Sequence, residues 1–234
     1  MNEMIYLGII FLSSLIVALL QLPLGTLLLL YHASLGKKIP KKTRTLISSF
    51  ISGSTLMFFL LLSASCFLIF ALTVSGTFTN VSLVVLTSYL VVLGIFSWFF
   101  YYKRKNSTEL WLPRKITKFI NQRAKETHDN SESFSLGVLT VLSEIVFTAP
   151  LFLLSGNSIL ILEPGYQVIA LVGFVLVSVL PLIILRIAIR TGKNLADIQR
   201  WRLKNKSFFR VITGLSYLIL ATFILTFLLM GDKI

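Results

Sequence analysis

The sequence contains one cysteine, Cys66, and two histidines, His32 and His128, among its 234 residues. A single cysteine cannot form a disulfide within the chain or a thiolate metal cluster, and histidines this far apart lack metal-ligand spacing. A phosphate-cradling glycine loop, a nucleophile elbow and a His-Glu-x-x-His motif are also absent from the sequence. These absences predict a protein that binds no cofactor and is not an enzyme.

Charged residues are scarce as well, at 13% of the chain against 56% hydrophobic residues. A soluble domain carries about a quarter charged residues. Six apolar runs are instead long enough to cross a hydrocarbon core of about 30 Å as helices. The runs cover residues 5–31, 46–74, 83–102, 134–155, 166–185 and 211–230. Because the alternating pattern of membrane barrel strands is absent, we expect an all-α protein with six transmembrane helices in contact with the lipid bilayer.

The positive charges are confined to three segments of the chain. All but one of the 22 Lys and Arg residues lie in segments 32–45, 103–133 and 186–210, whereas segments 75–82 and 156–165 contain none. Six crossings place the three basic segments on one side, and the positive-inside rule makes that side cytoplasmic. The prediction is a multi-pass protein of the plasma (inner) membrane with both termini extracytoplasmic.

The net charge of +13 is explained by this topology. Basic segments beside a membrane bind the anionic lipids of the inner leaflet, so no nucleic-acid partner is expected. Within the linker 103–133, Leu112, Ile116, Phe119 and Ile120 recur with helical spacing. This stripe predicts an amphipathic helix lying on the inner membrane surface, or alternatively a docking helix for a membrane-protein partner.

The linker 103–133 divides the chain into a first three-helix repeat, 1–102, and a second, 134–234. Because three is odd, the second repeat must enter the membrane inverted relative to the first. Pro23 and Pro150 interrupt the first helix of each repeat. Interrupted helices at corresponding positions of inverted repeats indicate the central site of a transporter.

Glu144 is the acidic side chain that lies deep in an apolar run, in the middle of the fourth. A carboxyl group at that depth normally faces a water-filled cavity or a partner, and burial disfavours its charged form. We therefore expect Glu144 to carry a proton or bind a cation, with Thr148 on the same helix face. The alternative is a protonated carboxyl group that only holds two helices together.

Gln21, Pro23 and Pro150 complete the predicted site. A proline has no backbone N–H, so Pro23 and Pro150 leave the carbonyls of Leu19 and Val146 without their helical donors. Freed carbonyls inside a bundle can bind a cation or a polar solute. The alternative is a tolerated kink, which is common in membrane helices.

Four short segments carry a resemblance to a known family: LLQLPL (19–24), FTAPLF (147–152), LPL (180–182) and RVITG (210–214). They resemble the transmembrane domain of the cytochrome c biogenesis and thiol-disulfide interchange proteins, a branch of the lysine exporter superfamily. The resemblance implies two inverted three-helix repeats. It also implies cysteines near positions 20 and 147, where this chain has Leu20 and Phe147. Thiol exchange across the membrane needs two cysteines, so the redox activity is not expected here.

Two functions remain open from the sequence. The first is a small secondary transporter or exporter of a small solute or ion, with Glu144 as its coupling site. The second is a non-transporting membrane scaffold or assembly factor that binds a partner through its basic cytoplasmic segments.

Overall fold

The computed structural model describes residues 2–20, 40–77, 80–100, 119–120, 122–124, 126–127, 129–190 and 204–231. Within these residues the regular elements are helices, and no strand occurs. The main helices are α1 (Asn2–Leu19), α3 (Pro40–Val74), α4 (Asn80–Phe100), α6 (Asn130–Ser143), α7 (Ile145–Ile161), α8 (Pro164–Arg190) and α10 (Lys206–Gly231). The predicted all-α class is confirmed.

Four helices are long and apolar enough to cross a membrane, and α6 with α7 would add a fifth span if the bent pair is one crossing. The four are Arg44–Val74, Val81–Phe99, Pro164–Ala188 and Ser207–Leu228. They coincide with the predicted runs 46–74, 83–102, 166–185 and 211–230, although residues 101–102 lie outside the described part. The chain is therefore a multi-pass membrane protein whose apolar helices contact the lipid bilayer.

The other two predicted runs have different outcomes. For run 5–31 the structure describes only the part up to Leu20, where Glu3–Leu19 forms a shorter apolar helix, so the count of six spans stays a prediction. Run 134–155 is wrong as a single helix. The chain bends by 80° between α6 and α7, and the two helices together extend from Asn130 to Ile161.

The start of α6 lies inside the segment 103–133 that we predicted as a linker. Asp129 is the N-cap residue, and it forms a capping box with Glu132. This reciprocal arrangement satisfies backbone donors that the first helical turn cannot bond itself. Of the predicted amphipathic stripe, Phe119 and Ile120 are helical, whereas residues 103–118 lie outside the described part.

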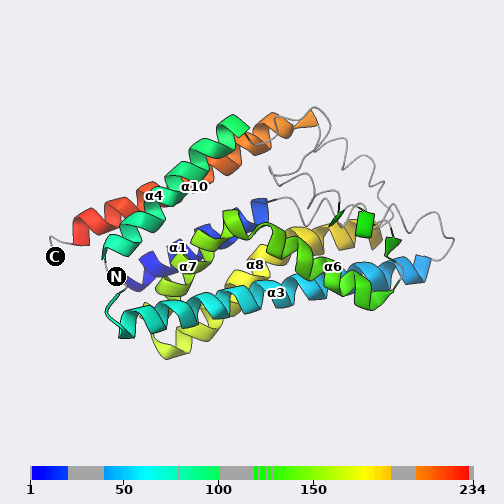
Figure 1. Ribbon diagram of the computed structural model, residues 1–234, viewed down its shortest axis with the longest axis horizontal. Coiled ribbons are helices and arrows are strands. Elements are labelled where there is room, and N and C mark those ends of the chain that lie inside the picture. Colours follow the sequence, from blue (N-terminus) through cyan, green and yellow to red (C-terminus); the bar gives the residue numbers. More distant parts are fainter. Residues whose placement is uncertain are drawn as a thin grey trace.

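The helices pack in two groups, shown in Figure 1. The first group is a pair, α4 and α10, which lie side by side along one edge of the molecule. In the second group α1 and α3 each pack against both α7 and α8, and α3 also packs along α6. The pair contacts the second group through α1–α10 and α4–α7.

Small residues allow the closest helix contacts. A Cβ atom at Gly53 of α3 would collide with the backbone carbonyl of Phe134, and one at Gly137 of α6 would collide with the carbonyl of Phe50. Between them Ser54 Oγ donates to the Gly137 carbonyl at 3.3 Å. Such small-residue contacts bring helix backbones together where lipid provides no hydrophobic drive.

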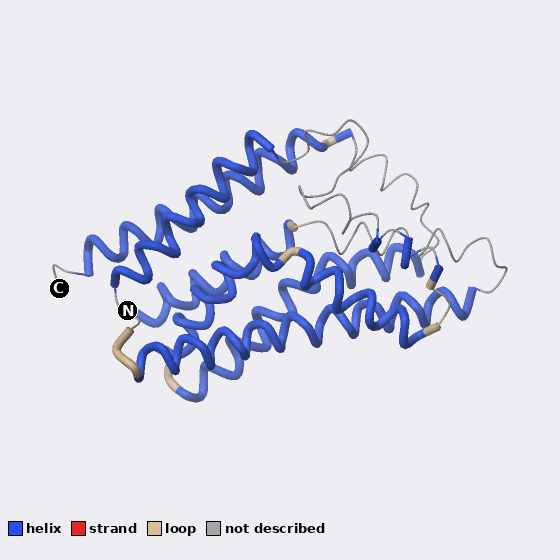
Figure 2. Tube along the Cα trace, in the orientation of Figure 1, coloured by secondary structure: helices blue, strands red, loops and turns tan. Residues whose placement is uncertain are grey.

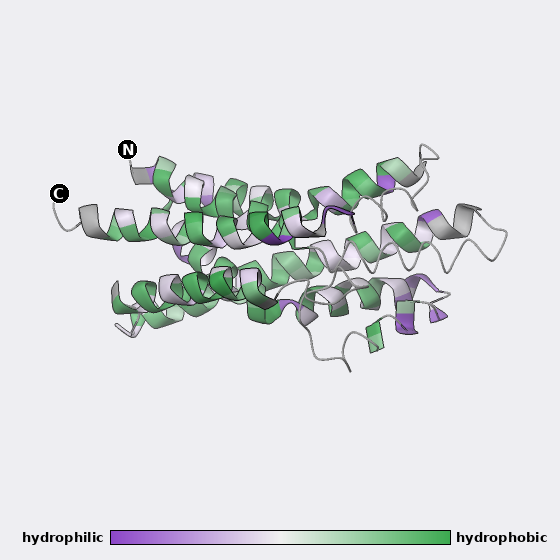
Figure 3. Cartoon of the chain, turned by 90° about the horizontal axis from the view of Figure 1, so that it is seen from above, coloured by the Kyte–Doolittle hydropathy of each residue, from purple (hydrophilic) through white to green (hydrophobic). Residues whose placement is uncertain are grey.

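The ends of the bundle agree with the charge pattern. The turn after α3, the turn after α7, the start of α1 and the end of α10 lie at the same end of the molecule (Figures 1 and 2). Both turns belong to the segments that contain no Lys or Arg. Figure 3 shows hydrophobic residues along the helices and hydrophilic residues gathered at the opposite end, where α6 begins.

Candidate functional site

The candidate site is the break between α6 and α7, where Glu144 is the single residue between the two helices. Its backbone angles, φ −90° and ψ 0°, lie in the bridge region that often occurs at functional sites. The Glu144 side chain is 1% exposed, so its carboxyl group is buried at the bend. The sequence predicted a buried carboxyl group correctly but placed it inside a continuous helix.

Hydroxyl groups replace the backbone hydrogen bonds that the bend removes at the end of α6. The Glu144 backbone N–H donates to the Val141 carbonyl at 3.1 Å rather than to Thr140, its partner in a regular helix. Ser143 Oγ donates to the Thr140 carbonyl instead, at 2.6 Å. The helix can therefore end inside an apolar environment with this carbonyl satisfied.

The first turn of α7 begins on the Glu144 carbonyl. That oxygen accepts the backbone N–H groups of Phe147, at 2.9 Å, and Thr148, at 3.1 Å. Thr148 Oγ1 also donates to it, at 3.2 Å. Thr148 thus lies next to Glu144, and its hydroxyl contacts the Glu144 backbone carbonyl.

Pro150 lies inside α7 and leaves the Val146 carbonyl without a helical donor, as the sequence predicted. Tyr89 of α4 takes the place of the missing donor, because its hydroxyl donates to the Val146 carbonyl at 2.9 Å. On the next carbonyl, the Tyr217 hydroxyl of α10 donates to Phe147 at 2.9 Å. The α4–α10 pair thus holds the first turn of α7 by two tyrosines.

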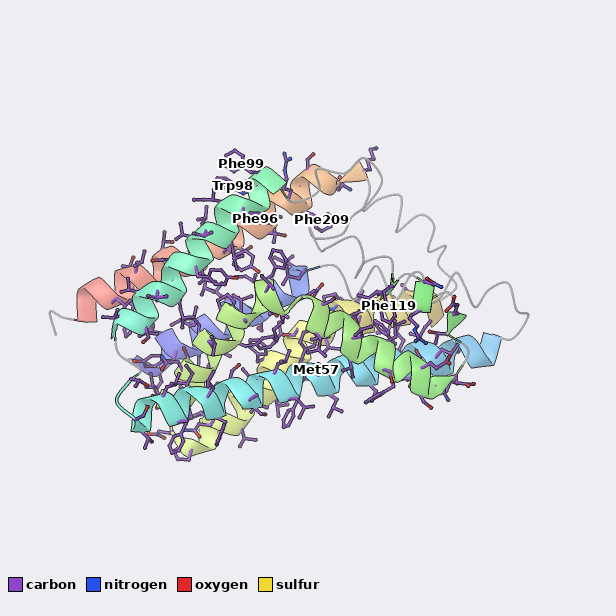
Figure 4. The ribbon with its side chains drawn as sticks, in the orientation of Figure 1. Met57, Phe96, Trp98, Phe99, Phe119 and Phe209 are labelled. Atoms are coloured by element: carbon purple, nitrogen blue, oxygen red, sulfur yellow. The ribbon has the colours of Figure 1, made fainter. Side chains whose placement is uncertain are left out.

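The two tyrosines and Glu144 form one polar group at the break. Tyr217 is 1% exposed and interacts electrostatically with both Glu144 and Tyr89. Beside this polar group, Phe96 of α4 packs against Phe147 of α7, and the two ring centroids lie 6.5 Å apart. Phe96 is labelled in Figure 4, near the end of α4 where Trp98, Phe99 and Phe209 also gather.

Tyr89 and Tyr217 were missed by the sequence analysis, although a signal for them exists. Each stands in the middle of a predominantly apolar helix, where a phenol hydroxyl must find an acceptor because the bilayer core contains no water. The sequence also predicts that Pro23 and Pro150 free the carbonyls of Leu19 and Val146. Pairing mid-helix hydroxyls with freed carbonyls would have suggested the Tyr89 contact.

Gln21 and Pro23, the remaining predicted site residues, lie outside the described residues. The part of the first run that is described ends nearby: α1 stops at Leu19, and Leu20 is buried. Both α1 and α6 end midway along the long axis of the molecule (Figures 1 and 2). The end of α1 and the end of α6 therefore lie at a similar level along the bundle.

No group of three or more His, Cys, Asp or Glu side chains that could hold a metal ion occurs among the described residues. Cys66 is half-buried in α3, where its backbone packs beside Gly156 of α7.

A cavity lies where the linker meets α6, away from the break at Glu144. This cavity has a volume of about 560 Å³. Its lining combines apolar, hydroxyl and charged side chains from Phe119, Arg123, Glu126, Thr127, Ser131, Glu132, Ser135, Leu136 and Leu139. Arg123 lies over the Phe119 ring, 5.4 Å from its centroid. Glu126 accepts a hydrogen bond from Gln122 at 2.9 Å, so part of the lining is already engaged within the chain.

Comparison with known proteins adds no assignment to this geometry. No family model, no curated protein and no solved structure matches the chain.

Proposed function

We propose that this chain is a small secondary transporter or exporter that moves a small solute or ion, with Glu144 as its coupling site. The observation that carries the proposal is a buried carboxyl group at an 80° break between two apolar helices. An ionisable group inside a membrane protein is expensive to bury and is usually functional. Transporters bind substrate and coupling ion at discontinuous helices near the membrane midplane.

The pattern of helix contacts supports two inverted repeats. If α1, α3 and α4 correspond to α7, α8 and α10, the contact α1–α8 corresponds to α3–α7, and α1–α10 corresponds to α4–α7. The contacts α1–α7, α3–α8 and α4–α10 each correspond to themselves. The weaker α7–α8 contact has no comparable α1–α3 counterpart, and the region that would match α3–α6 includes residues outside the described part. This arrangement fits the scaffold implied by the cytochrome c biogenesis resemblance, without its redox activity.

The transporter would lie in the plasma (inner) membrane with both termini extracytoplasmic. The supporting observations are the segregation of 21 of the 22 Lys and Arg residues into three segments and the location of both Lys/Arg-free turns beside the start of α1 and the end of α10.

A ligand screen on purified protein tests the proposal. Thermal unfolding of wild type, Glu144→Gln and Glu163→Gln is measured against amino acids, organic anions and metal ions. Glu163→Gln is the matched control, since it makes the same change at an exposed position between α7 and α8. A ligand at about 100 times its dissociation constant stabilises the folded state by about 2.7 kcal/mol. We expect a solute that shifts the melting temperature of wild type and Glu163→Gln but not of Glu144→Gln.

Absence of any such solute, with Glu144→Gln as stable as wild type, would contradict the transporter. It would favour the second candidate, a scaffold that binds a membrane-protein partner through the basic cytoplasmic segments. The cavity between the linker and α6 is the observation that supports this alternative. The scaffold predicts that a partner copurifies with the chain and that deletion of residues 110–126 abolishes its binding.

A further inference from the structure

We propose that the ion carried by Glu144 is a proton and not a metal cation. This inference rests on the proposed transporter and names its coupling ion. The argument compares what each ion would need with the oxygen atoms that the break offers.

Three backbone oxygens around the break, those of Thr140, Val141 and Glu144, already accept hydrogen bonds. The Thr140 carbonyl accepts from Ser143 Oγ at 2.6 Å, and the Val141 carbonyl accepts from the Glu144 N–H at 3.1 Å. The Glu144 carbonyl accepts from two backbone N–H groups and from the Thr148 hydroxyl. A broken helix usually offers such carbonyls to a cation, but these three carbonyls each have a donor from the protein itself.

The same holds for the first turn of α7. Tyr89 donates to the Val146 carbonyl and Tyr217 to the Phe147 carbonyl, both at 2.9 Å. The Val146 carbonyl is the one that Pro150 frees, so it is the natural cation ligand at this site. A cation could use these oxygens at full strength only if the α4–α10 pair withdrew its hydroxyl donors.

The requirements of the two ions differ sharply. Hard cations such as Mg²⁺ and Ca²⁺ take about six to eight oxygen ligands. The described residues provide one carboxyl group at the break, and they contain no cluster of carboxylate, thiol and imidazole groups. A proton needs only the carboxyl group, and binding it removes the cost of a buried charge. The geometry at Glu144 therefore suits a proton that is taken up and released as access alternates.

Within the described part, no second carboxyl group lies at the level of Glu144. Tyr217 of α10 and Tyr89 of α4 are the ionisable groups that lie around Glu144. Cys66 of α3 packs beside Gly156, toward the far end of α7. The remaining described ionisable side chains on the packed helices stand within two turns of a helix end: Glu3, Tyr6, Arg44, Glu132, Tyr166, Arg186 and Arg210.

Infrared difference spectroscopy of the purified protein tests the inference without a known solute. The carbonyl stretch of a protonated carboxyl group is separate from the bands of carboxylates and amides, so it reports protonation directly. As the pH is lowered, we expect a titrating band in wild type and in Glu163→Gln that is missing in Glu144→Gln. Glu144→Asp keeps a carboxyl group and must retain a band with a shifted midpoint, which preserves the test if Glu144→Gln folds poorly.

The same titration with added Na⁺, K⁺, Mg²⁺ or Ca²⁺ tests whether a metal cation competes with the proton. The titration should be unchanged by each salt at matched ionic strength. Displacement of the proton band by one cation, or no Glu144-dependent band at all, would overturn the inference. The proposed function fails differently: the band would persist while no solute is bound or transported. Transport that needs Glu144 but follows a metal-ion gradient would retain the function and refute the proton.

Discussion

Tyr89 and Tyr217 make the same contact with consecutive carbonyls of α7, but the two carbonyls differ in what else they can accept. The Phe147 carbonyl can also accept the N–H of Leu151 in the regular helical pattern. The Val146 carbonyl has no helical donor, because the residue four positions on is Pro150, which has no N–H. An acceptor left unsatisfied in an apolar environment costs about 1–3 kcal/mol. Loss of the Tyr89 hydroxyl should therefore destabilise the protein more than loss of the Tyr217 hydroxyl.

A double-mutant cycle isolates this effect. Tyr89→Phe in the wild-type background should lower stability by about 1 kcal/mol, and Tyr217→Phe by less. Pro150→Ala restores an N–H at position 150, so Tyr89→Phe should then have little effect, giving a coupling energy of about 1 kcal/mol. Thermal and denaturant unfolding in detergent measure the four proteins. Equal losses from Tyr89→Phe in both backgrounds would show that the tyrosine does not replace the missing donor.

The close packing of α3 against α6 depends on a position where no side chain larger than a hydrogen atom fits. At Gly53 of α3 the obstacle to a Cβ atom is the backbone carbonyl of Phe134, which cannot rotate away. Gly173 of α8 is the matched control, because nothing lies within 4 Å of a Cβ atom there. Gly53→Ala should destabilise by about 1–3 kcal/mol through overpacking of the α3–α6 contact. Gly173→Ala should be neutral or stabilise by up to about 1 kcal/mol, because alanine favours a helix over glycine.

Melting temperatures of the two variants, measured in the same detergent, test this predicted difference in stability. If Gly53→Ala melts like Gly173→Ala, the close approach of α3 and α6 is not required for stability.

Elements were predictable from the sequence where hydropathy alone determines them. The runs that became α3, α4, α8 and α10 are apolar and long, and only a helix satisfies their backbone in a membrane. The break at Glu144 was not predictable in this way, since an apolar run has the same hydropathy whether it is straight or bent. The sequence predicted an interruption at Pro150, yet α7 continues through it, and the Tyr89 hydroxyl supplies the donor that the Val146 carbonyl lacks. The actual bend lies at Glu144, where Ser143 replaces a lost backbone bond with its hydroxyl.

For the whole molecule, the sequence predicted what depends on composition and failed where distant residues meet. The buried carboxyl group could be identified because it is a single acidic residue in an apolar run. Its neighbours could not, because Tyr89 and Tyr217 come from helices far away in the sequence. The contact α4–α7 that brings Tyr89 to Val146 exists only once both groups of helices are assembled.

The orientation of the whole chain gives the last prediction. Thr77 and Glu163 are exposed in the two turns without Lys or Arg, and Lys204 is exposed beside the start of α10 at the other end. In a Cys66→Ser background, single cysteines are introduced as Thr77→Cys, Glu163→Cys and Lys204→Cys. Since basic segments remain on the cytoplasmic side, a membrane-impermeant maleimide should label the first two in intact cells and the third only after permeabilisation.

The reverse labelling pattern would show that the chain enters the membrane in the opposite orientation and that its basic segments are held outside. Labelling of only one of the two turns in intact cells would place them on different sides of the membrane. In that case α6 and α7 would not make one crossing together, because an odd number of crossings must separate the two turns. Glu144 would then lie in a re-entrant hairpin, and the inverted-repeat interpretation would fall with the topology.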